Sequence, residues 1–326
     1  MADPIDAMRE KVRRQLPDTQ WYDWIMEFHR HPPKQVAGSC GQYTYFHHQG
    51  LKRKQIPLMG VTKSMSSYLY SYSKHQAYRQ RAKKKRARPR KRIGAPPPSP
   101  QPASIAPIKH EKGGITGRAR GTMIHHHIHD MVYMDEATFK RAHPEGKHKW
   151  AENVWKHLKE RNWYPIIPEF LVYRLDYYLA TRIDLVCVER HSGKILFIEL
   201  KTGYVDDFID DLPGHAWTKE IMKNYACSHE KLALVQIDLG VQMALDDLCE
   251  LSDMPDWPDH VWEAYVVHVF DDVKEPRLTE LNKDFFKEHG KVLYDNVGMA
   301  RRKDVAAKKA ARKKPKSIKE RRGHAT

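Results

Sequence analysis

The sequence has few cysteines, and none of them is placed for a metal cluster. Its 326 residues include four, and no two of these have the Cys-x-x-Cys spacing, so we expect no iron–sulfur cluster. This scarcity is typical of a chain that works in a reducing compartment. No apolar run approaches the ~18 residues of a membrane span, and the first residues lack the pattern of a secretory or mitochondrial leader. We therefore expect neither a membrane span nor a cleaved N-terminal signal.

Acidic residues are fewer than basic ones, and the formal net charge is +16. Residues 79–92 contain ten Lys or Arg and no acid, and residues 301–322 contain twelve Lys or Arg with two acids. The rest of the chain is therefore slightly acidic. Basic runs of this density bind phosphates or direct nuclear import. An acidic remainder is compatible with carboxylates that collect a divalent cation.

Composition divides the chain into four parts. Residues 1–78 contain scattered aromatics without clean periodicity, so their order is uncertain. Residues 79–113 are first basic and then proline-rich, a composition that predicts an extended linker. Residues 114–290 have the periodic apolar pattern of a globular domain. Residues 291–326 are rich in Lys, Arg and Ala, which predicts a basic tail that is disordered or only partly helical.

Apolar periodicity within residues 114–290 predicts an α/β fold. Helices are expected at 121–134 and 149–161, where apolar residues recur at helical spacing. Three strand-like runs follow at 169–173, 177–189 and 194–201, then a mostly helical segment at 215–251 with a break near Gly240, and a last strand at 262–270. This order is typical of a mixed central sheet flanked by helices.

The strongest chemical signal lies in the strands expected at 177–189 and 194–201. The turn signal His191-Ser192-Gly193 joins them, and a hairpin centred there places Asp184 directly opposite Glu199. Because side chains alternate along a strand, Lys201 points to the same face as Glu199. Two facing carboxylates repel each other, and a bound cation would compensate the repulsion.

These three side chains are suited to the hydrolysis of a phosphodiester bond. Asp184 and Glu199 would bind Mg²⁺, with Mn²⁺ as a substitute, and the backbone carbonyl of Leu200 would complete the ligand set. The ion would polarise the attacking water. Lys201 would orient that water, neutralise the transition state or accept a proton. An ordinary surface ion pair in a hairpin is the alternative interpretation of the same residues.

Further residues extend the motif on both sides. In chain order they are Gly121-x-x-x-His125 in an expected helix, Glu169 after a proline, and Gln236 in the later helical segment. The complete ordered set resembles the RecB-like and lambda-exonuclease-like branch of the PD-(D/E)XK nuclease superfamily. The resemblance covers roughly residues 114–270 and implies a restriction-endonuclease-like core, with a mixed central sheet flanked by helices.

The resemblance also implies an activity and individual roles. It implies an Mg²⁺-dependent exonuclease that acts on DNA ends or single strands in recombination, repair or replication. His125 would be an additional metal ligand, Glu169 would organise the metal site or its water, and Gln236 would lie near the DNA backbone or the site. One departure is that members of the family often have an acid four residues after the histidine, whereas this chain has His129 there, and the nearest acid is Asp130.

Two alternatives remain open. His125 and His129 have the spacing of a zinc site on one helical face, although the glutamate of a His-Glu-x-x-His motif is absent because residue 126 is histidine. The second alternative to a nuclease is a nucleic-acid-binding or packaging protein, in which the basic segments carry the function and the nuclease-like core is catalytically silent. Whether the chain is a nuclease or a binding protein, the expected partner is DNA, and the basic run at 83–92 favours a nuclear location.

Overall fold

The computed structural model describes most of the chain from residue 117 onward and parts of the segment before it. The described residues are 10, 14, 22–23, 25–26, 36–39, 42–49, 52–72, 117–203, 208–212, 214–225, 227–252, 258–270, 275–282 and 286–313. The linker expected at 79–113 and the basic run within it lie outside these ranges. So do the last residues of the basic tail.

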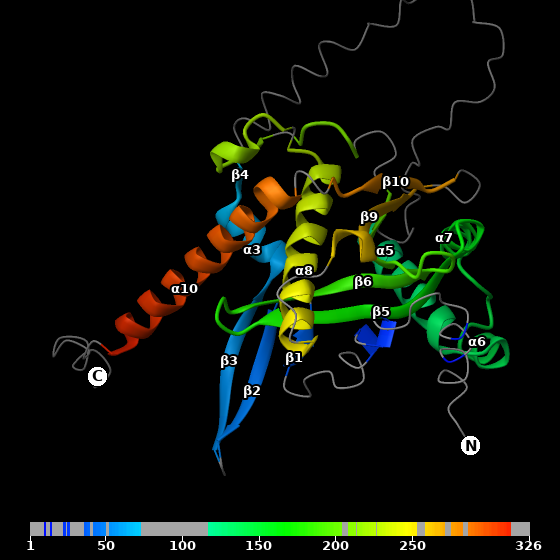
Figure 1. Ribbon diagram of the computed structural model, residues 1–326, viewed down its shortest axis with the longest axis horizontal. Coiled ribbons are helices and arrows are strands. Elements are labelled where there is room, and N and C mark those ends of the chain that lie inside the picture. Colours follow the sequence, from blue (N-terminus) through cyan, green and yellow to red (C-terminus); the bar gives the residue numbers. More distant parts are fainter. Residues whose placement is uncertain are drawn as a thin grey trace, which may run out of the picture.

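A mixed eight-stranded sheet forms the centre of the molecule (Figure 1). Its strands are β1 (Val36–Ser39), β2 (Gln42–Gln49), β3 (Lys52–Gly60), β5 (Trp163–Arg174), β6 (Leu179–Glu189), β7 (Ile195–Thr202), β9 (Trp262–Val269) and β10 (Arg277–Glu280). The order is β1-β2-β3-β6-β7-β9-β10, and β5 also pairs with β6. The β3–β6 and β7–β9 pairs are parallel and the others are antiparallel. A small separate sheet pairs β4 (Tyr70–Tyr72) with β8 (His215–Trp217).

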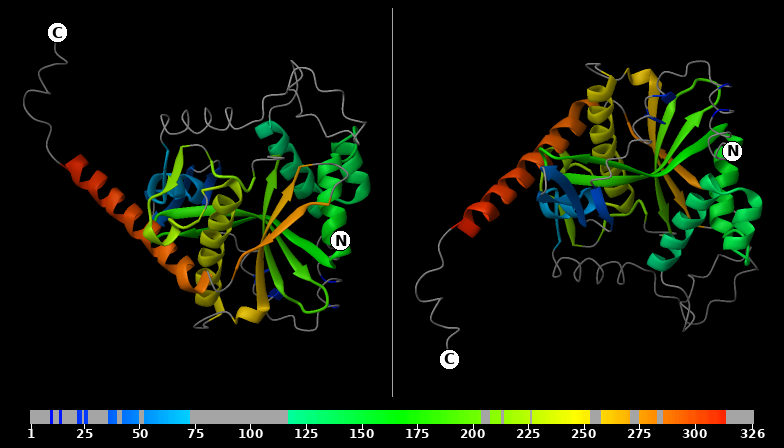
Figure 2. Two further views of the ribbon diagram at one scale, coloured as in Figure 1. Left: turned by 90° about the horizontal axis from the view of Figure 1, so that it is seen from above. Right: turned by 90° about the horizontal axis from the view of Figure 1, so that it is seen from below.

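Helices cover both faces of the sheet (Figure 2). The helices are α3 (Val61–Tyr68), α5 (Gly117–Tyr133), α6 (Glu136–Ala142), α7 (Lys149–Glu160), α8 (His229–Ser252) and α10 (Lys291–Lys313). Leu196 and Ile198 of β7 are buried in one cluster with α5 and α7, whereas Phe197 is buried in another with α3, α8 and α10. Because successive strand residues face opposite sides, β7 has an apolar layer on each face. The expected α/β class, with a mixed sheet between helices, is confirmed.

The predicted hairpin register is also present. Leu185 pairs with Ile198 and Val188 with Ile195, which is the register that places residue 184 opposite residue 199. The helices expected at 121–134 and 149–161 correspond to α5 and α7. The strand expected at 169–173 is longer than predicted, since β5 runs from Trp163 to Arg174.

The expectation for residues 215–251 is partly wrong. Only its second part is an α-helix, and the first part contains β8 and a 3-10 turn at Glu220–Met222. Gly240 does not break α8, which continues to Ser252. A side chain at this position would have its Cβ only 3.3 Å from Ile183 of β6. Glycine therefore permits close packing of the helix on the sheet here, rather than a break.

The expected limits of the globular domain, 114–290, are too narrow. On the N-terminal side, β3 joins the sheet beside β6, and Val61 and Met65 of α3 are buried in the same cluster as Phe197. Part of the segment 1–78, whose order the sequence left uncertain, therefore belongs to the core. Its apolar residues lacked a clear signal because a short helix and an edge hairpin have few periods from which to recognise them.

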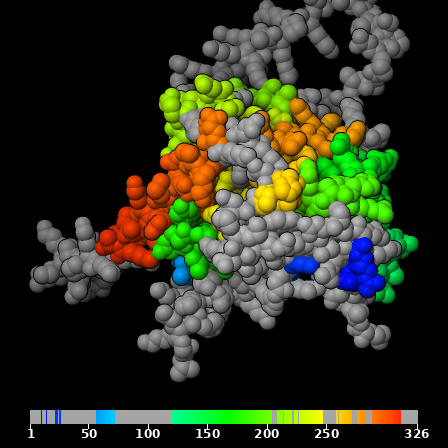
Figure 3. Space-filling model, in the orientation of Figure 1, coloured from blue at the N-terminus to red at the C-terminus, as the bar shows by residue number. Residues whose placement is uncertain are grey.

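Residues 291–313 form the helix α10, which agrees with the expectation of a partly helical tail, but the start of this helix packs in the core and is not a solvated tail. Leu293, Tyr294 and Val297 are fully buried, and the end of the helix projects from the body (Figure 3). Arg301 is also buried, so it is not part of a solvated basic arm. The start of the helix has a short apolar stripe, which the high Lys and Ala content of the whole segment made hard to recognise in the sequence.

Paired substitutions in α10 test this correction. Leu293→Ala should lower the free energy of unfolding by about 2–5 kcal/mol, because it leaves a cavity in the core. The adjacent Val292→Ala is the matched control, since Val292 is 47% exposed and a change at such a position is expected to stay within about 0.5 kcal/mol. Urea unfolding followed by circular dichroism measures both. Equal stability of the two variants would mean that α10 does not pack on the core.

Candidate metal centre

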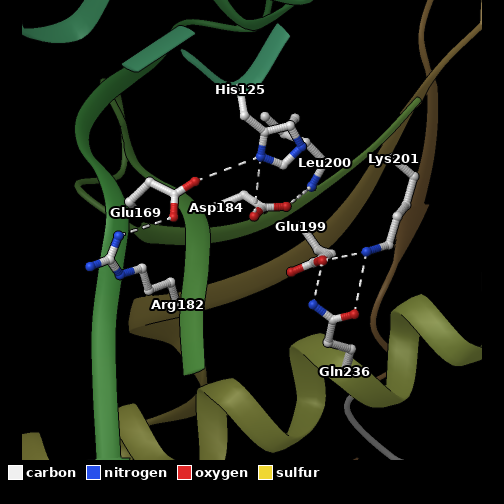
Figure 4. A network of polar contacts seen from close by, with 8 residues as sticks. All are labelled: His125, Glu169, Arg182, Asp184, Glu199, Leu200, Lys201 and Gln236. Carbon is white, nitrogen blue, oxygen red and sulfur yellow. Dashed lines mark hydrogen bonds and ion pairs between the residues drawn. The ribbon is translucent and has the colours of Figure 1, made fainter. Parts of the chain in front are cut away.

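Five elements bring the residues predicted from the sequence to one place (Figure 4). His125 comes from α5, Glu169 from β5, Asp184 from β6, Glu199, Leu200 and Lys201 from β7, and Gln236 from α8. The carboxylates therefore come from three neighbouring strands, and the helices that supply His125 and Gln236 lie on opposite faces of the sheet. Hydrogen bonds and ion pairs join His125, Glu169, Asp184 and Leu200 in one group. A second group contains Glu199, Lys201 and Gln236, and Asp184 acts electrostatically on Glu199 between the two groups.

Gly121 determines how closely α5 approaches β7. A Cβ at this position would lie 2.9 Å from Oγ1 of Thr202, a distance at which either the threonine side chain or the helix would have to shift. His125 follows one turn later, on the same side of the helix. Its Nδ1 atom lies 3.4 Å from Oδ1 of Asp184 and 3.7 Å from Oε1 of Glu169. The Gly-x-x-x-His spacing therefore places an imidazole between two carboxylates.

Glu169 has an unusual backbone conformation. Its φ is +52°, in the left-handed region that costs a residue other than glycine about 1–3 kcal/mol. Its neighbours Pro168 and Phe170 pair with Leu185 and Ile183 of β6, so Glu169 lies across from Asp184. Ile167 and Phe170 pack in the same cluster, although simple alternation would place them on opposite faces. The alternation of side chains between the two faces of the sheet is thus interrupted at Glu169.

Asp184 interrupts the pairing of β6 with β7. Its Oδ2 atom accepts a hydrogen bond of 2.7 Å from the backbone N–H of Leu200. The N–H and C=O of one residue leave a strand on the same side, so the carbonyl of Leu200 also faces β6. This orientation is compatible with the predicted role of the Leu200 carbonyl as a ligand of a hard cation.

Glu199, Lys201 and Gln236 form a closed triangle of polar contacts. Nζ of Lys201 lies 2.5 Å from Oε1 of Glu199 and 3.3 Å from Oε1 of Gln236. Nε2 of Gln236 donates to the same carboxylate oxygen at 2.6 Å. The helical glutamine therefore holds both β7 side chains in one arrangement. Both contacts of Glu199 use Oε1, and the nearby Asp184 acts electrostatically on the Glu199 carboxyl group.

The electrostatics of the centre indicate a deficit of positive charge. Burial, together with the neighbouring Asp184, raises the pKa of Glu199. Burial, together with Glu169, also raises the pKa of Asp184, although His125 and Lys201 act in the opposite direction. Burial acts to lower the pKa of His125, but Asp184 and Glu169 overcome this effect and raise it to about 9. Burial and neighbouring carboxylates thus oppose the ionisation of Asp184 and Glu199, and a bound cation would favour it.

The donor set fits a hard divalent cation. One ligand atom each from His125, Glu169 and Asp184 lies within 4.8 Å of the others. Carboxylate and carbonyl oxygens are the preferred ligands of Mg²⁺ and Mn²⁺. A protonated His125 already bridges the two carboxylates, so it stands where a cation would be attracted.

Arg182 is a functional candidate that the sequence did not single out. Its Nη1 atom lies 3.8 Å from Oε2 of Glu169, and its Nε atom is buried with no hydrogen-bond partner among the described residues. Arg182 is 40% exposed, which leaves its guanidinium accessible to an anion. The available signal was the Arg-Ile-Asp sequence, which places Arg182 two residues before Asp184 on one strand.

The histidines weighed as a zinc pair are separated in the structure. His125 lies between Glu169 and Asp184, whereas Nδ1 of His129 lies 3.0 Å from Asp130. The Asp130 carboxylate, the nearest acid after His125, is directed away from the centre to His129 and His143. The spacing of four residues suggested one site, but each ring is held by different acids.

No protein-family model matches the chain, and neither does any curated protein sequence.

Proposed function

We propose that the chain is a metal-dependent deoxyribonuclease with a core of the PD-(D/E)XK type. The observation that carries the proposal is the convergence of Glu169, Asp184 and Glu199 from three strands, together with His125 and Lys201 (Figure 4). An ion pair on the surface of a hairpin would not need two largely buried carboxylates, Asp184 and Glu199, beside the partly exposed Glu169. Glu199 is only 2% exposed, and Lys201 is a neighbouring cation of both Glu199 and Asp184, so a further cation would stabilise this pair of buried carboxylates.

Each residue of the centre would have a separate role in phosphodiester hydrolysis. Asp184, Glu199, His125 and the carbonyl of Leu200 would hold Mg²⁺, and Glu169 would complete or order this set. When bound, the ion supplies neutralisation of phosphate charge and activation of water. Lys201 would place its ammonium beside the scissile phosphate and stabilise the charge that develops there. Gln236 keeps Lys201 and Glu199 in position through its amide.

Basic groups outside the centre would bind the DNA backbone. Arg302, Lys303 and Lys309 lie around a shallow hollow on α10 beside Tyr178, and Nζ of Lys309 is 3.3 Å from the tyrosine hydroxyl. Together with the basic runs at 79–92 and 314–322 they would contact phosphates without reading base sequence. None of the described helices has the length and apolarity to cross a membrane. The run at 83–92 would direct the protein to the nucleus.

A substrate panel tests the proposal. The purified full chain is incubated with Mg²⁺ and with linear or circular DNA, each single- or double-stranded. We propose an exonuclease of DNA recombination, repair or replication, so linear DNA should be degraded and circular DNA should persist. Cleavage of circular DNA would instead assign an endonuclease. If DNA is bound but never cleaved with either Mg²⁺ or Mn²⁺, the alternative of a nucleic-acid-binding or packaging protein with a silent core replaces the proposal.

The affinity of the centre for Mg²⁺ should depend on pH. In the metal-free protein the pKa of His125 is raised to about 9, so the ring is protonated at neutral pH and must lose its proton to become a ligand. Affinity should therefore rise as the pH increases through about 9, and binding below that pH should release protons. Calorimetric titration in buffers of different ionisation enthalpy measures this release. His125→Ala should reduce it, and His126→Ala, a change at the exposed neighbouring histidine, should leave it unchanged.

A further inference from the structure

A second group of metal-ligand side chains lies beyond the candidate metal centre, where α5, α6 and α7 meet. His127 extends from α5 and is only 4% exposed, while His143 and Glu145 belong to the turn between α6 and α7. The ring centroids of His127 and His143 are 4.3 Å apart. This group shares no residue with the centre around Asp184.

The tautomer of His143 is determined by Asp130. Nε2 of His143 lies 2.8 Å from Oδ2 of Asp130, and an ionised carboxylate can only accept a hydrogen bond. The proton of the neutral ring is therefore on Nε2, and the lone pair is on Nδ1. That Nδ1 atom lies 3.6 Å from Oε1 of Glu145. An imidazole whose far N–H is held by a carboxylate is the usual arrangement around a metal-binding histidine.

His127 also has a defined lone pair. The backbone N–H of His148 donates to Nδ1 of His127 at 3.0 Å, so in the neutral ring the proton is on Nε2. A cation that binds Nδ1 would take over this lone pair and release the amide. One ligand atom each from His127, His143 and Glu145 lies within 4.8 Å of the others. The group thus presents two imidazoles and one carboxylate at a separation that a single ion can bridge.

We propose that His127, His143 and Glu145 bind one Zn²⁺ ion, with a water in the fourth position. Two nitrogen donors and one oxygen donor favour a borderline metal such as zinc over Mg²⁺, which prefers oxygen. Glu145 is 66% exposed, so the ion can enter from solvent. Bound there, it joins α5 to the turn between α6 and α7. Because His125 lies on the same helix, the ion would hold in place the helix that supplies a ligand to the candidate metal centre.

Zinc binding can be measured independently of any cleavage. The full chain is prepared with His125→Ala and Asp184→Asn, which disable the other candidate site, then freed of metal and titrated with Zn²⁺ in competition with a chromophoric chelator. One equivalent should bind. In this background His143→Ala should abolish stoichiometric binding, and Asp130→Asn should weaken it by about 10–100-fold, the usual effect of losing a carboxylate that orients a ligand. Co²⁺ in place of zinc should give the absorption of a tetrahedral site.

Two further variants keep the test decisive if His143→Ala fails to fold. Glu145→Gln alters an exposed side chain and should still weaken binding, whereas His126→Ala removes an exposed imidazole from the same helix and should change nothing. Failure of the parent protein to bind one equivalent would overturn the proposal, as would undiminished binding in Glu145→Gln. Zinc binding is measured in a parent protein whose other candidate site is disabled, and absence of DNA cleavage by the wild type would overturn only the proposed nuclease. The two proposals can therefore fail separately.

Discussion

Asp184→Asn should lower the rate of DNA cleavage at saturating Mg²⁺ by about 1,000-fold or more. The substitution removes the negative charge that attracts the ion to the junction of β5, β6 and β7. It preserves an oxygen that can accept the 2.7 Å hydrogen bond from the Leu200 N–H, so the hairpin should remain intact. Single-turnover cleavage of a labelled linear duplex gives the rate. DNA affinity should persist, because phosphate contacts come mainly from other groups.

Asp184→Ala should have the same effect on rate and a different effect on stability. Facing carboxylates repel, which by itself would make the metal-free alanine variant at least as stable as the wild type. However, alanine also leaves the buried N–H of Leu200 without an acceptor, at a cost of about 1–3 kcal/mol. We therefore expect the alanine variant to melt at a lower temperature than the asparagine variant.

Asp176→Asn is the matched control for both Asp184 variants, since Asp176 is 47% exposed at the β5–β6 turn. It should cleave at the wild-type rate. The wild type should melt at a higher temperature in the presence of Mg²⁺, because a ligand that binds only the native state stabilises it. The Asp184 variants should lose this gain. Wild-type turnover in Asp184→Asn would end the assignment of a nuclease to this centre.

Lys201→Ala should reduce cleavage by about 100- to 1,000-fold, as expected for the loss of a cation that stabilises the transition state. The lysine also lies 2.5 Å from Glu199, whose pKa is already raised by burial and by Asp184. Without Lys201, which acts to lower that pKa, the carboxyl should hold its proton to still higher pH. The acidic limb of the pH–rate profile should therefore move upward, a shift that a merely destabilised protein would not produce.

The other end of β7 offers a matched ion pair for comparison. Lys194 lies 2.5 Å from Glu263 and is 33% exposed, against 26% for Lys201. Lys194→Ala should leave both the rate and its pH dependence unchanged. If Lys194→Ala and Lys201→Ala slow cleavage equally, then Lys201 contributes only to folding and the proposed chemical role is wrong. Gln236→Ala should give a smaller loss than Lys201→Ala, because the glutamine acts through the two β7 side chains.

The arrangement of the β6–β7 hairpin could be predicted because it depends on local rules. A turn signal sets the register, and strict alternation along a strand places Glu199 and Lys201 on one face. The role of His125 was implied by the resemblance to a nuclease family, but the Gly-x-x-x-His pattern is also local, since one helical turn separates the residue that allows close packing from the residue that reaches the centre. These rules need no knowledge of the remaining fold.

Only the tertiary structure decided which side chains meet across elements. Nothing in the spacing of His125, His127 and His129 shows that the first lies between Glu169 and Asp184, while the second meets a turn after α6. The positive φ of Glu169 is likewise imposed by packing around it, because its own sequence does not favour that conformation. Some residues before 78 and after 290 also belong to the core because they pack against segments that are distant in the sequence. Burial depends on the surfaces that distant segments present to each other, whereas sequence periodicity records only the neighbours along the chain.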